Sequence, residues 1–567
     1  MIMPLSEVRP GMQATVRTVF EGGKIEEFGA EIIGVMDSYL GPHQDLILAR
    51  LKGDRVAFTG VAGGMSGSPV YVDGRLIGAL SYRMGTFLKE PIAGVTPIEY
   101  MLAVAEEGSP GGARAAGDPP GAPDGLRPIE TPLMVAGAPD GTLAMYADEL
   151  ARLGLGRVVP GAVAASAFGV TGGLSTPGTA ATTSTRSLDP LRAGDPIAAR
   201  LVTGDISFAA TGTVTYVDGD KVYAFGHPAF LSGAAELPMA RAEIFLTLAS
   251  LQASNKMPRI LDTIGTFRQS RLPAMTGVIG PSPRMVPVTL TVTGGSAPRR
   301  FAYEVVDHKV FTPLLVGFLT SASLINTPWY ADEMTLALAG RIAIEGHPDL
   351  MLNDLYSELP GGQPPAATLA RDVQGLFGAV FQNRWEPVVV KSVHLDVATV
   401  ERNAMSVVEA VYPSRTEMEA GEEVKLRVVI RPFRGSAFTR TFAWRAPEGT
   451  PPGPIAITVG GANLLGAVER NVLARQVTQS DTLDQLITVI NRLRTSDKLY
   501  MKITRREAGA VVLSEILPAL PPSVLSTLSG NRGSGEVTPM AETTLHEEEI
   551  PLEQLVSGGT VVPITIK

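Results

Sequence analysis

The chain has 567 residues, a net charge of -9, a pI near 5.4 and no cysteine. This length predicts roughly three to four domains. The missing cysteine excludes a thiol nucleophile, a thiolate metal site and disulfides, and the absence of a Lys/Arg cluster argues against nucleic-acid binding. With 61 Gly, 44 Pro and short Val/Thr/Ile segments, the composition is typical of a mainly β protein.

Residues 1–107 predict a small β-barrel. Short β-type segments alternate with turn signals such as Asp73-Gly74, and a helix is expected at 97–107. The strands are expected at 13–20, 28–36, 45–51, 56–60, 69–72 and 76–82.

A hexapeptide at 64–69, Gly-Met-Ser-Gly-Ser-Pro, lies between two of these strands. The pattern G-x-S-G-x-P suits a serine nucleophile, Ser66, on a tight turn, with the backbone N–H groups of Gly64 and Ser66 as an oxyanion hole. The alternative is a glycine-rich hairpin turn that carries two serines.

Residues 108–195 predict a linker and a small mixed α/β segment, with a helix at 146–154. Two stretches, 106–126 and 172–187, are rich in small residues and are candidates for exposed loops and for self-cleavage. Residues 196–356 predict a second barrel with helices at 240–251 and 315–321. Its strands are expected at 196–210, 212–217, 221–225, 263–268, 286–293 and 300–306.

His227 is the candidate general base among the six histidines of the chain. It ends a predicted strand between Gly226 and Pro228, so its backbone is held while the ring can point into a cleft. The other five histidines are interpreted as loop, strand or surface residues.

The carboxy-terminal part begins with a Pro/Gly-rich linker at 357–383. Alternating segments predict an immunoglobulin-like β-sandwich at 384–460, followed by a helix and a β segment at 461–567. The clearest helix of the chain is expected at 482–494, where Thr482 and Gln485 could form a capping box.

At these residues the chain resembles the stage IV sporulation protein B peptidases, a family of chymotrypsin-like serine endopeptidases. The similarity rests on the serine motif with its trailing hairpin at 64–79, the segment 94–102, and the histidine segment at 212–227. It covers roughly residues 1 to 350. The resemblance implies a bacterial serine peptidase that makes limited cuts in a partner or in itself.

The chain departs from the family in three ways. Ser66 precedes His227, whereas the family has the reverse order, so a permuted pair of barrels is expected. Neither a membrane anchor nor a PDZ domain is found. The acid of a triad has no clean match: Asp54 is the candidate, with Glu236, Glu243 and Asp262 as rivals, and a Ser-His dyad oriented by a backbone carbonyl or an amide is an alternative.

The sequence therefore predicts a permuted double β-barrel serine endopeptidase, followed by the sandwich and a small α/β carboxy-terminal segment. The alternative function is a catalytically silent scaffold for peptide binding or envelope assembly. We expect no cofactor and no metal, a protein or peptide substrate that includes the chain itself, no nucleic acid and no integral membrane segment. An exported protein whose signal is absent from this chain is expected, with the cytoplasm as the alternative. The sequence does not predict the oligomeric state.

Overall fold

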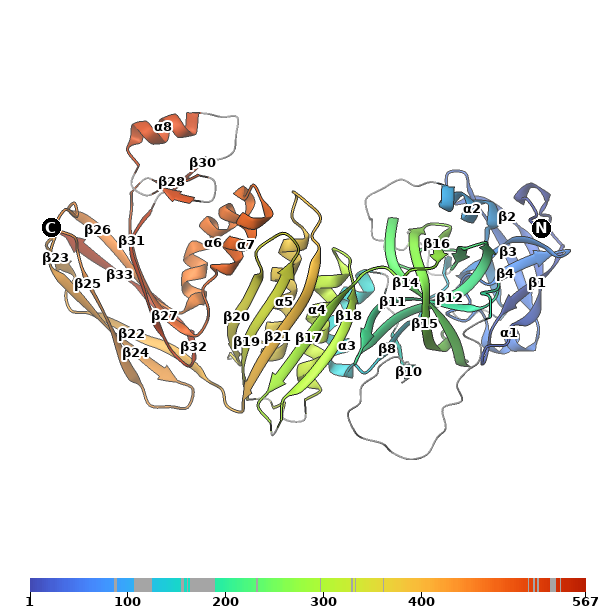
Figure 1. Ribbon diagram of the computed structural model, residues 1–567, viewed down its shortest axis with the longest axis horizontal. Helices are drawn as coiled ribbons and strands as arrows, with labels where there is room; N and C mark the ends of the chain where they lie inside the picture. The colour runs from blue at the N-terminus through green and yellow to red at the C-terminus, as the bar shows by residue number, and fades with distance from the viewer. Residues whose placement is uncertain are drawn as a thin grey trace. The chain divides into compact units, whose positions relative to one another are not determined.

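The computed structural model divides the chain into two compact units (Figure 1). The first contains Met1–Met285 and Tyr303–Phe311, and the second contains Val286–Ala302 and Thr312–Lys567. The structure describes all residues except 86–88, 107–124, 154, 156–157, 161, 164–188, 231–232, 296, 328–329, 332, 360, 508, 513–514, 518–519, 531–536 and 541.

Six strands of the first unit form a closed barrel in the order β4-β1-β2-β3-β6-β5, with β5 pairing back to β4. Its interior is apolar, with Val16, Ile47 and Val70 fully buried. A seventh strand, β7, pairs with β5 outside this ring. The elements of this part are η1 (Leu5–Glu7), β1 (Gln13–Thr18), β2 (Glu26–Gly41), β3 (Gln44–Lys52), α1 (Asp54–Thr59), β4 (Pro69–Val72), β5 (Arg75–Met84), β6 (Ile92–Pro97), α2 (Ile98–Glu106) and β7 (Leu126–Pro128).

The strand expected at 56–60 is wrong, because these residues belong to helix α1. Only Val56 of this helix is buried, and Phe58 is largely exposed. A segment of six residues is too short for its apolar positions to distinguish a helix from a strand.

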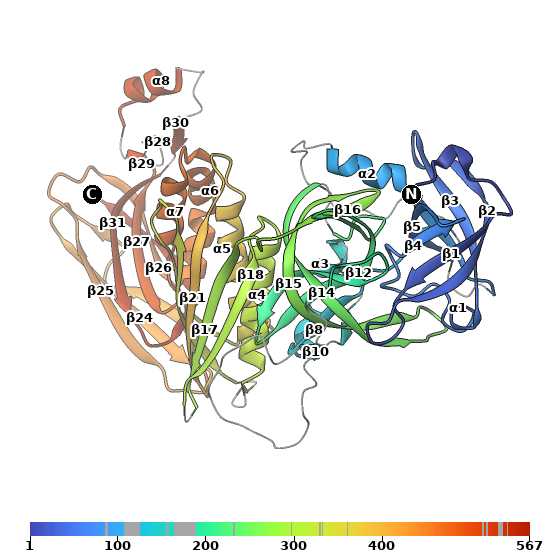
Figure 2. The ribbon, with the colours of Figure 1, turned by 45° about the vertical axis from the view of Figure 1, so that its right-hand side comes forward.

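A second ring of six strands closes in the order β11-β14-β15-β16-β13-β12, with β12 pairing back to β11. Figure 2 shows the two barrels side by side within the first unit. The strands of the second ring are β11 (Pro196–Gly204), β12 (Ser207–Asp218), β13 (Lys221–Ala224), β14 (Gly233–Leu248), β15 (Asn255–Arg271) and β16 (Ala274–Ile279). Beside them lie β8 (Leu133–Ala136), α3 (Asp140–Arg152), β9 (Val158–Pro160) and β10 (Ala162–Val163).

The helix expected at 240–251 is also wrong, because strand β14 runs through most of it. Ala240, Ala242 and Ile244 are buried while Phe245 is 69% exposed, so burial follows the two-residue period of a strand. Pairing with β11 and β15 on either side decides the conformation.

The second unit contains strands in the order β20-β19-β21-β17 with the Arg299–Ala302 part of β18, a pair of smaller sheets that pack together, and a separate sheet of three short strands. Helix α5 packs against β19 and β20. Helix α4 covers the expected 315–321. These elements are β17 (Met285–Thr293), β18 (Arg299–Val306), α4 (Phe311–Ile325), β19 (Thr335–Ile344), β20 (Leu350–Ser357), α5 (Pro365–Phe381) and β21 (Val390–Val400).

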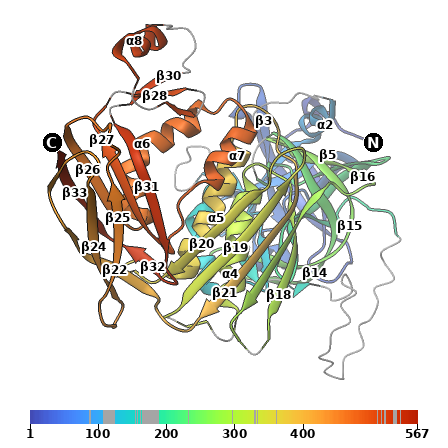
Figure 3. The ribbon, with the colours of Figure 1, turned by 60° about the vertical axis from the view of Figure 1, so that its left-hand side comes forward.

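The two smaller sheets share one apolar core and form a β-sandwich (Figure 3). The first consists of β22 (Met405–Pro413), β24 (Glu423–Pro432), β25 (Phe438–Arg445) and β32 (Leu555–Ser557). The second consists of β23 (Glu417–Met418), β26 (Gly453–Gly460), β27 (Lys498–Arg505), β31 (Thr543–Pro551) and β33 (Gly559–Ile566). Strands from the expected sandwich region 384–460 and from the expected carboxy-terminal segment 461–567 therefore form one sandwich.

The remaining elements are inserted between sandwich strands: α6 and α7 lie between β26 and β27, and β28, β29, α8 and β30 lie between β27 and β31. The helix expected at 482–494 is confirmed as α7, where the Thr482 side chain accepts a hydrogen bond from the Gln485 amide at 3.3 Å. The bounds of these remaining elements are α6 (Ala462–Gln479), α7 (Leu483–Asn491), β28 (Gly509–Val512), β29 (Glu515–Leu517), α8 (Pro522–Gly530) and β30 (Val537–Met540). The prediction of a mainly β protein with a barrel and a sandwich is confirmed.

Candidate active site

The turn that carries Ser66 depends on two glycines in the left-handed region, Gly64 with φ +87° and Gly67 with φ +94°. A Cβ atom on Gly67 would lie 2.0 Å from the Thr213 carbonyl oxygen, so no larger residue fits there. Ser66 itself is fully buried, and its Oγ has no hydrogen-bond partner among the described residues.

Strand β12 of the second barrel holds this turn through three hydrogen bonds. The Thr213 amide donates to the Ser66 carbonyl at 2.8 Å, and the Thr213 hydroxyl donates to the Gly64 carbonyl at 3.0 Å. The Thr215 hydroxyl donates to the Gly67 carbonyl at 2.7 Å. The two predicted motifs, at 64–79 and 212–227, are therefore in direct contact.

His227 follows two residues in the left-handed region, Phe225 with φ +68° and Gly226 with φ +71°. A bulky residue such as Phe225 adopts this conformation only where its surroundings hold it. The Gly226 carbonyl accepts a hydrogen bond from the Thr96 hydroxyl of the first barrel at 2.8 Å, which fixes the turn before the histidine.

The imidazole of His227 is 2% exposed. Its Nδ1 lies 2.8 Å from the Pro228 carbonyl oxygen, which can only accept, so Nδ1 carries the proton. Nε2 is then the nitrogen with a free lone pair, and it is buried with no hydrogen-bond partner. This is the tautomer that a general base requires.

Burial lowers the pKa of His227 from its usual 6.5 to about 4, because the charged imidazolium loses its hydration. The backbone carbonyls of Pro228 and Ile129 partly oppose this shift by favouring the charged form. The imidazole is therefore neutral at pH 7 and can accept a proton, while two carbonyl dipoles are placed to stabilise the imidazolium.

The structure does not bring Asp54 to this imidazole. Asp54 is exposed at the first residue of α1, and in the described part of the chain it has no hydrogen bond or ion pair. Glu236 pairs with Arg268 at the surface, and Asp262 is exposed. No carboxylate contributes to the pKa shift of His227, and the Pro228 carbonyl takes the position that an acid would occupy at Nδ1.

Of the two amides predicted to form an oxyanion hole, the Gly64 N–H donates to the Glu130 carbonyl oxygen at 3.1 Å. The Ser66 N–H has no partner among the residues that the structure describes. In this conformation the Gly64 amide is therefore already bonded to a carbonyl group of the protein itself, and the oxyanion hole stays a prediction.

Sequence reasoning missed Lys256, which lies at the start of β15 and is 1% exposed. A Cβ atom on Gly64 would lie 3.3 Å from the Lys256 Cβ, so the lysine stem packs against the serine turn. The Lys256 Nζ donates to the Thr18 hydroxyl at 2.7 Å, and the Ser68 hydroxyl donates to the same oxygen at 3.0 Å. Burial lowers the pKa of Lys256 to about 7. No motif surrounds it in the sequence, so no signal was available.

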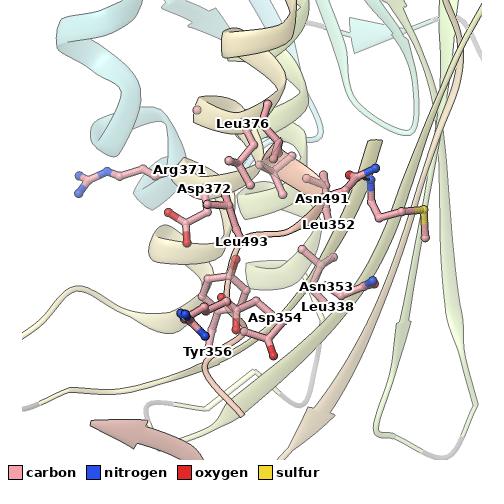
Figure 4. A pocket seen from close by; sticks show the side chains of 16 residues that line it. Leu338, Leu352, Asn353, Asp354, Tyr356, Arg371, Asp372, Leu376, Asn491 and Leu493 are labelled. Atoms are coloured by element: carbon pink, nitrogen blue, oxygen red, sulfur yellow. Dashed lines mark hydrogen bonds between the residues drawn. The ribbon is translucent and has the colours of Figure 1, made fainter. Parts of the chain in front are cut away.

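The second unit contains a separate cavity of about 370 Å³ (Figure 4). Asp354, Tyr356 and Asp372 line it together with residues of α5 and α7, and burial raises the pKa of all three groups. The Asp354 carboxylate accepts from the amides of Ser496 and Leu355, so it supports the local backbone. None of the predicted site residues lines this cavity.

Comparison with family models assigns residues 2–102 to SpoIVB peptidase S55. The resemblance to the stage IV sporulation protein B peptidases is thus confirmed over the segment that carries Ser66, which is similar to this peptidase family. Comparison with curated proteins and with solved structures yields no match. Among the described helices, none is long and apolar enough to cross a lipid bilayer.

Proposed function

We propose that the chain is a serine endopeptidase with Ser66 as nucleophile and His227 as general base. One observation supports the proposal: within the described part of the chain, the Ser66 Oγ and the His227 Nε2 are both buried without a partner, on turns that share contacts with β12. The two atoms are not hydrogen-bonded to each other in this conformation, so the proposal requires that they approach when a substrate binds. Buried polar atoms are nearly always hydrogen-bonded, because leaving one unpaired costs about 1–3 kcal/mol. Two such atoms on adjoining turns are explained by a site that binds and cleaves a substrate.

In this mechanism the Ser66 Oγ attacks the substrate carbonyl carbon as its proton passes to the His227 Nε2. The Pro228 carbonyl holds Nδ1–H, keeps the ring oriented and stabilises the imidazolium. The amides of Gly64 and Ser66 bind the developing oxyanion. His227 then donates its proton to the leaving amine, and water hydrolyses the acyl-enzyme by the same steps in reverse. Asp54 has no step in this sequence.

The proposed substrate is a protein or peptide, cut at few sites or within the chain itself. Limited cleavage is what the resemblance to the sporulation peptidases implies, and export of the protein stays a prediction with the cytoplasm as the alternative. Two stretches are predicted as self-cleavage sites, 106–126 and 172–187. Residues 107–124 of the first and all of the second lie outside the described residues. The order of the two site residues, Ser66 before His227, makes this a permuted arrangement of the chymotrypsin-like type.

A fluorophosphonate probe tests the nucleophile, since it labels only an activated serine. We expect labelling of the wild type and its loss in both Ser66→Ala and His227→Ala. Ser68→Ala is the matched control, because Ser68 is a buried serine two residues away whose hydroxyl already has a partner, and labelling should persist. A folded wild type that takes up no probe contradicts the proposal.

A peptide-binding scaffold without catalysis is the second candidate. It is favoured by the complete burial of Ser66 and by the Glu130 carbonyl that already occupies the Gly64 amide. The same labelling experiment separates the two functions, because a scaffold needs no activated serine.

A further inference from the structure

The segment 126–131 follows the edge of β5 as an added strand. Its first part, β7, pairs antiparallel with β5, with Pro128 opposite Tyr82 and Leu126 opposite Met84. The pairing continues beyond β7, where the Ile129 amide donates to the Ser81 carbonyl at 2.8 Å. Main-chain hydrogen bonds of this kind also hold an extended peptide on a sheet edge, whatever the peptide's sequence.

This segment reaches both halves of the proposed site. The Glu130 carbonyl accepts the hydrogen bond from the Gly64 amide at 3.1 Å. The carbonyl of Ile129 acts on the His227 imidazole and favours its charged form. The segment thus places a peptide carbonyl group on the predicted oxyanion donor, as a peptide substrate would.

Two side chains of the segment occupy specific positions. Ile129 is fully buried among the core residues of the first barrel. Glu130 pairs with Arg83 of β5, and the two side chains are only 25% and 12% exposed. An ion pair so shielded from water is stronger and more selective than one at the surface. The Glu130 Oε2 and the Arg83 Nε are buried without further partners.

We propose that the β5 edge is the peptide-binding cleft of the protein and that residues 126–131 occupy it as a resident peptide. Arg83 is its specificity-determining residue. It selects an acidic side chain at the residue whose carbonyl meets the Gly64 amide, preceded by an apolar residue in the position of Ile129. The substrate class is an extended peptide with an apolar-acidic pair. Cleavage of such a peptide rests on the proposed function, whereas its binding does not.

The resident segment has to leave before another peptide binds, so the test weakens the segment and supplies its sequence in trans. The Glu130→Gln variant loses the ion pair with Arg83. A labelled peptide of sequence Leu-Arg-Pro-Ile-Glu-Thr, followed by fluorescence anisotropy, is expected to bind this variant about tenfold more tightly than the wild type, since a charge-assisted hydrogen bond is removed from the competitor. Glu27→Gln, which breaks the Arg17–Glu27 pair of the same barrel, is the matched control and should not change binding.

Charge selectivity is tested first on the peptide, which adds no further folding risk. With Glu130→Gln protein, a peptide in which glutamine replaces the glutamate should bind about tenfold more weakly. Combining Glu130→Gln with Arg83→Glu should reverse the preference toward a peptide with lysine at that position. If the glutamate, glutamine and lysine peptides bind equally, or if no peptide binds Glu130→Gln, the segment is a permanent brace of the barrel and the inference is overturned.

The outcome is separable from that of the proposed function. Peptide binding that depends on Arg83, without labelling of Ser66 by a fluorophosphonate, supports the cleft and refutes the peptidase. Labelling of Ser66 without charge selectivity refutes the role of Arg83 and leaves the peptidase in place.

Discussion

The Gly64 amide donates a hydrogen bond of 3.1 Å to the carbonyl oxygen of Glu130, a residue 66 positions further along the chain. An amide next to the proposed nucleophile is thereby satisfied by a peptide carbonyl of the protein itself. Ser66 is at the same time fully buried. In the described conformation neither the Ser66 hydroxyl nor the Gly64 amide is available to a substrate, so under the proposed function we expect that residues 126–131 move before one binds.

Weakening the resident segment should accelerate labelling of Ser66. In Glu130→Gln the neutral amide keeps its shape but loses the charge that pairs with Arg83, so the open conformation is more populated. We expect the rate of fluorophosphonate labelling to rise about three- to tenfold, as a loss of roughly 1 kcal/mol of closing energy implies. Labelling rates that are equal in Glu130→Gln, Glu27→Gln and the wild type would contradict a gating role for the segment.

The serine turn should tolerate no side chain at Gly67. A Cβ there meets the Thr213 carbonyl oxygen at 2.0 Å and the Phe225 amide nitrogen at 2.5 Å, and φ is +94°. Gly67→Ala should lower the free energy of unfolding of the first unit by about 3 kcal/mol or more, through backbone strain and steric overlap. Labelling of Ser66 should be lost even in molecules that remain folded.

Gly74→Ala is the control for this prediction. Gly74 also has positive φ, +72°, but no atom lies within 4 Å of its Cβ position. Its substitution isolates the backbone strain, about 1 kcal/mol. Differential scanning calorimetry compares the two variants, and equal losses would show that the contact with Thr213 has no effect.

The pH dependence of labelling reports the burial of His227. Its pKa is lowered to about 4, so the neutral base persists on acidification well below the usual 6.5. If the imidazole stays buried when residues 126–131 move, the labelling rate should hold from pH 8 down to about 5 and fall with a midpoint near 4. Exposed His43 is the control site, and His43→Gln should leave the profile unchanged. A midpoint near 6.5 would mean that the imidazole is hydrated in the reactive conformation.

The same shift affects the stability of the fold. Because the pKa of His227 is lower in the folded state, the unfolded chain binds a proton between pH 6.5 and 4 that the folded chain does not. Stability therefore falls as the pH drops through this window, and below about pH 4 the contribution is constant. Circular dichroism at each pH separates a loss of labelling from a loss of structure.

The parts of the site that the sequence predicted are those encoded locally. Gly67 and Gly226 have positive φ and lie so close to neighbouring segments that a Cβ atom would meet them. Because glycine is required at both positions, the serine and histidine turns can be recognised from short patterns. Lys256 and Glu130 reach the serine turn only through pairing between distant segments, and no local pattern reports such contacts. The orienting acid was sought among carboxylates, whereas the structure supplies the backbone carbonyl of Pro228, which every residue possesses.

The secondary-structure errors have the same origin. The sequence predicts a strand where helix α1 lies and a helix where strand β14 lies. Over a few positions, their apolar residues fit both the helical and the strand period. Long-range pairing decided the case of β14, which is held by β11 and β15 on its two sides. The period-two segments at 69–72 and 221–225 were recognised because tight turns, Asp73-Gly74 and Asp218-Gly219, lie directly beside them.

Lys256 should make the stability of the first unit depend on pH in the alkaline range. Its pKa is lowered from 10.5 to about 7, because its ammonium group is buried with the Thr18 hydroxyl as its partner. Between pH 7 and 10.5 the unfolded chain holds a proton on this lysine that the folded chain has lost. The free energy of unfolding therefore rises with pH in this window, by up to about 1.4 kcal/mol per pH unit, and is flat below pH 7 with respect to this group.

Lys256→Met removes the titrating group while keeping the length of the stem. We expect the variant to be more stable than the wild type at pH 7 and the difference to shrink at pH 8 and again at pH 9. Lys221→Met, at an exposed position of β13, is the control and should leave the pH dependence unchanged. Thermal unfolding at the three pH values measures the effect. A wild-type rise that persists in Lys256→Met would assign the titration to another group, and a variant less stable than the wild type at pH 7 would show that the ammonium stays charged and stabilises the serine turn through Thr18.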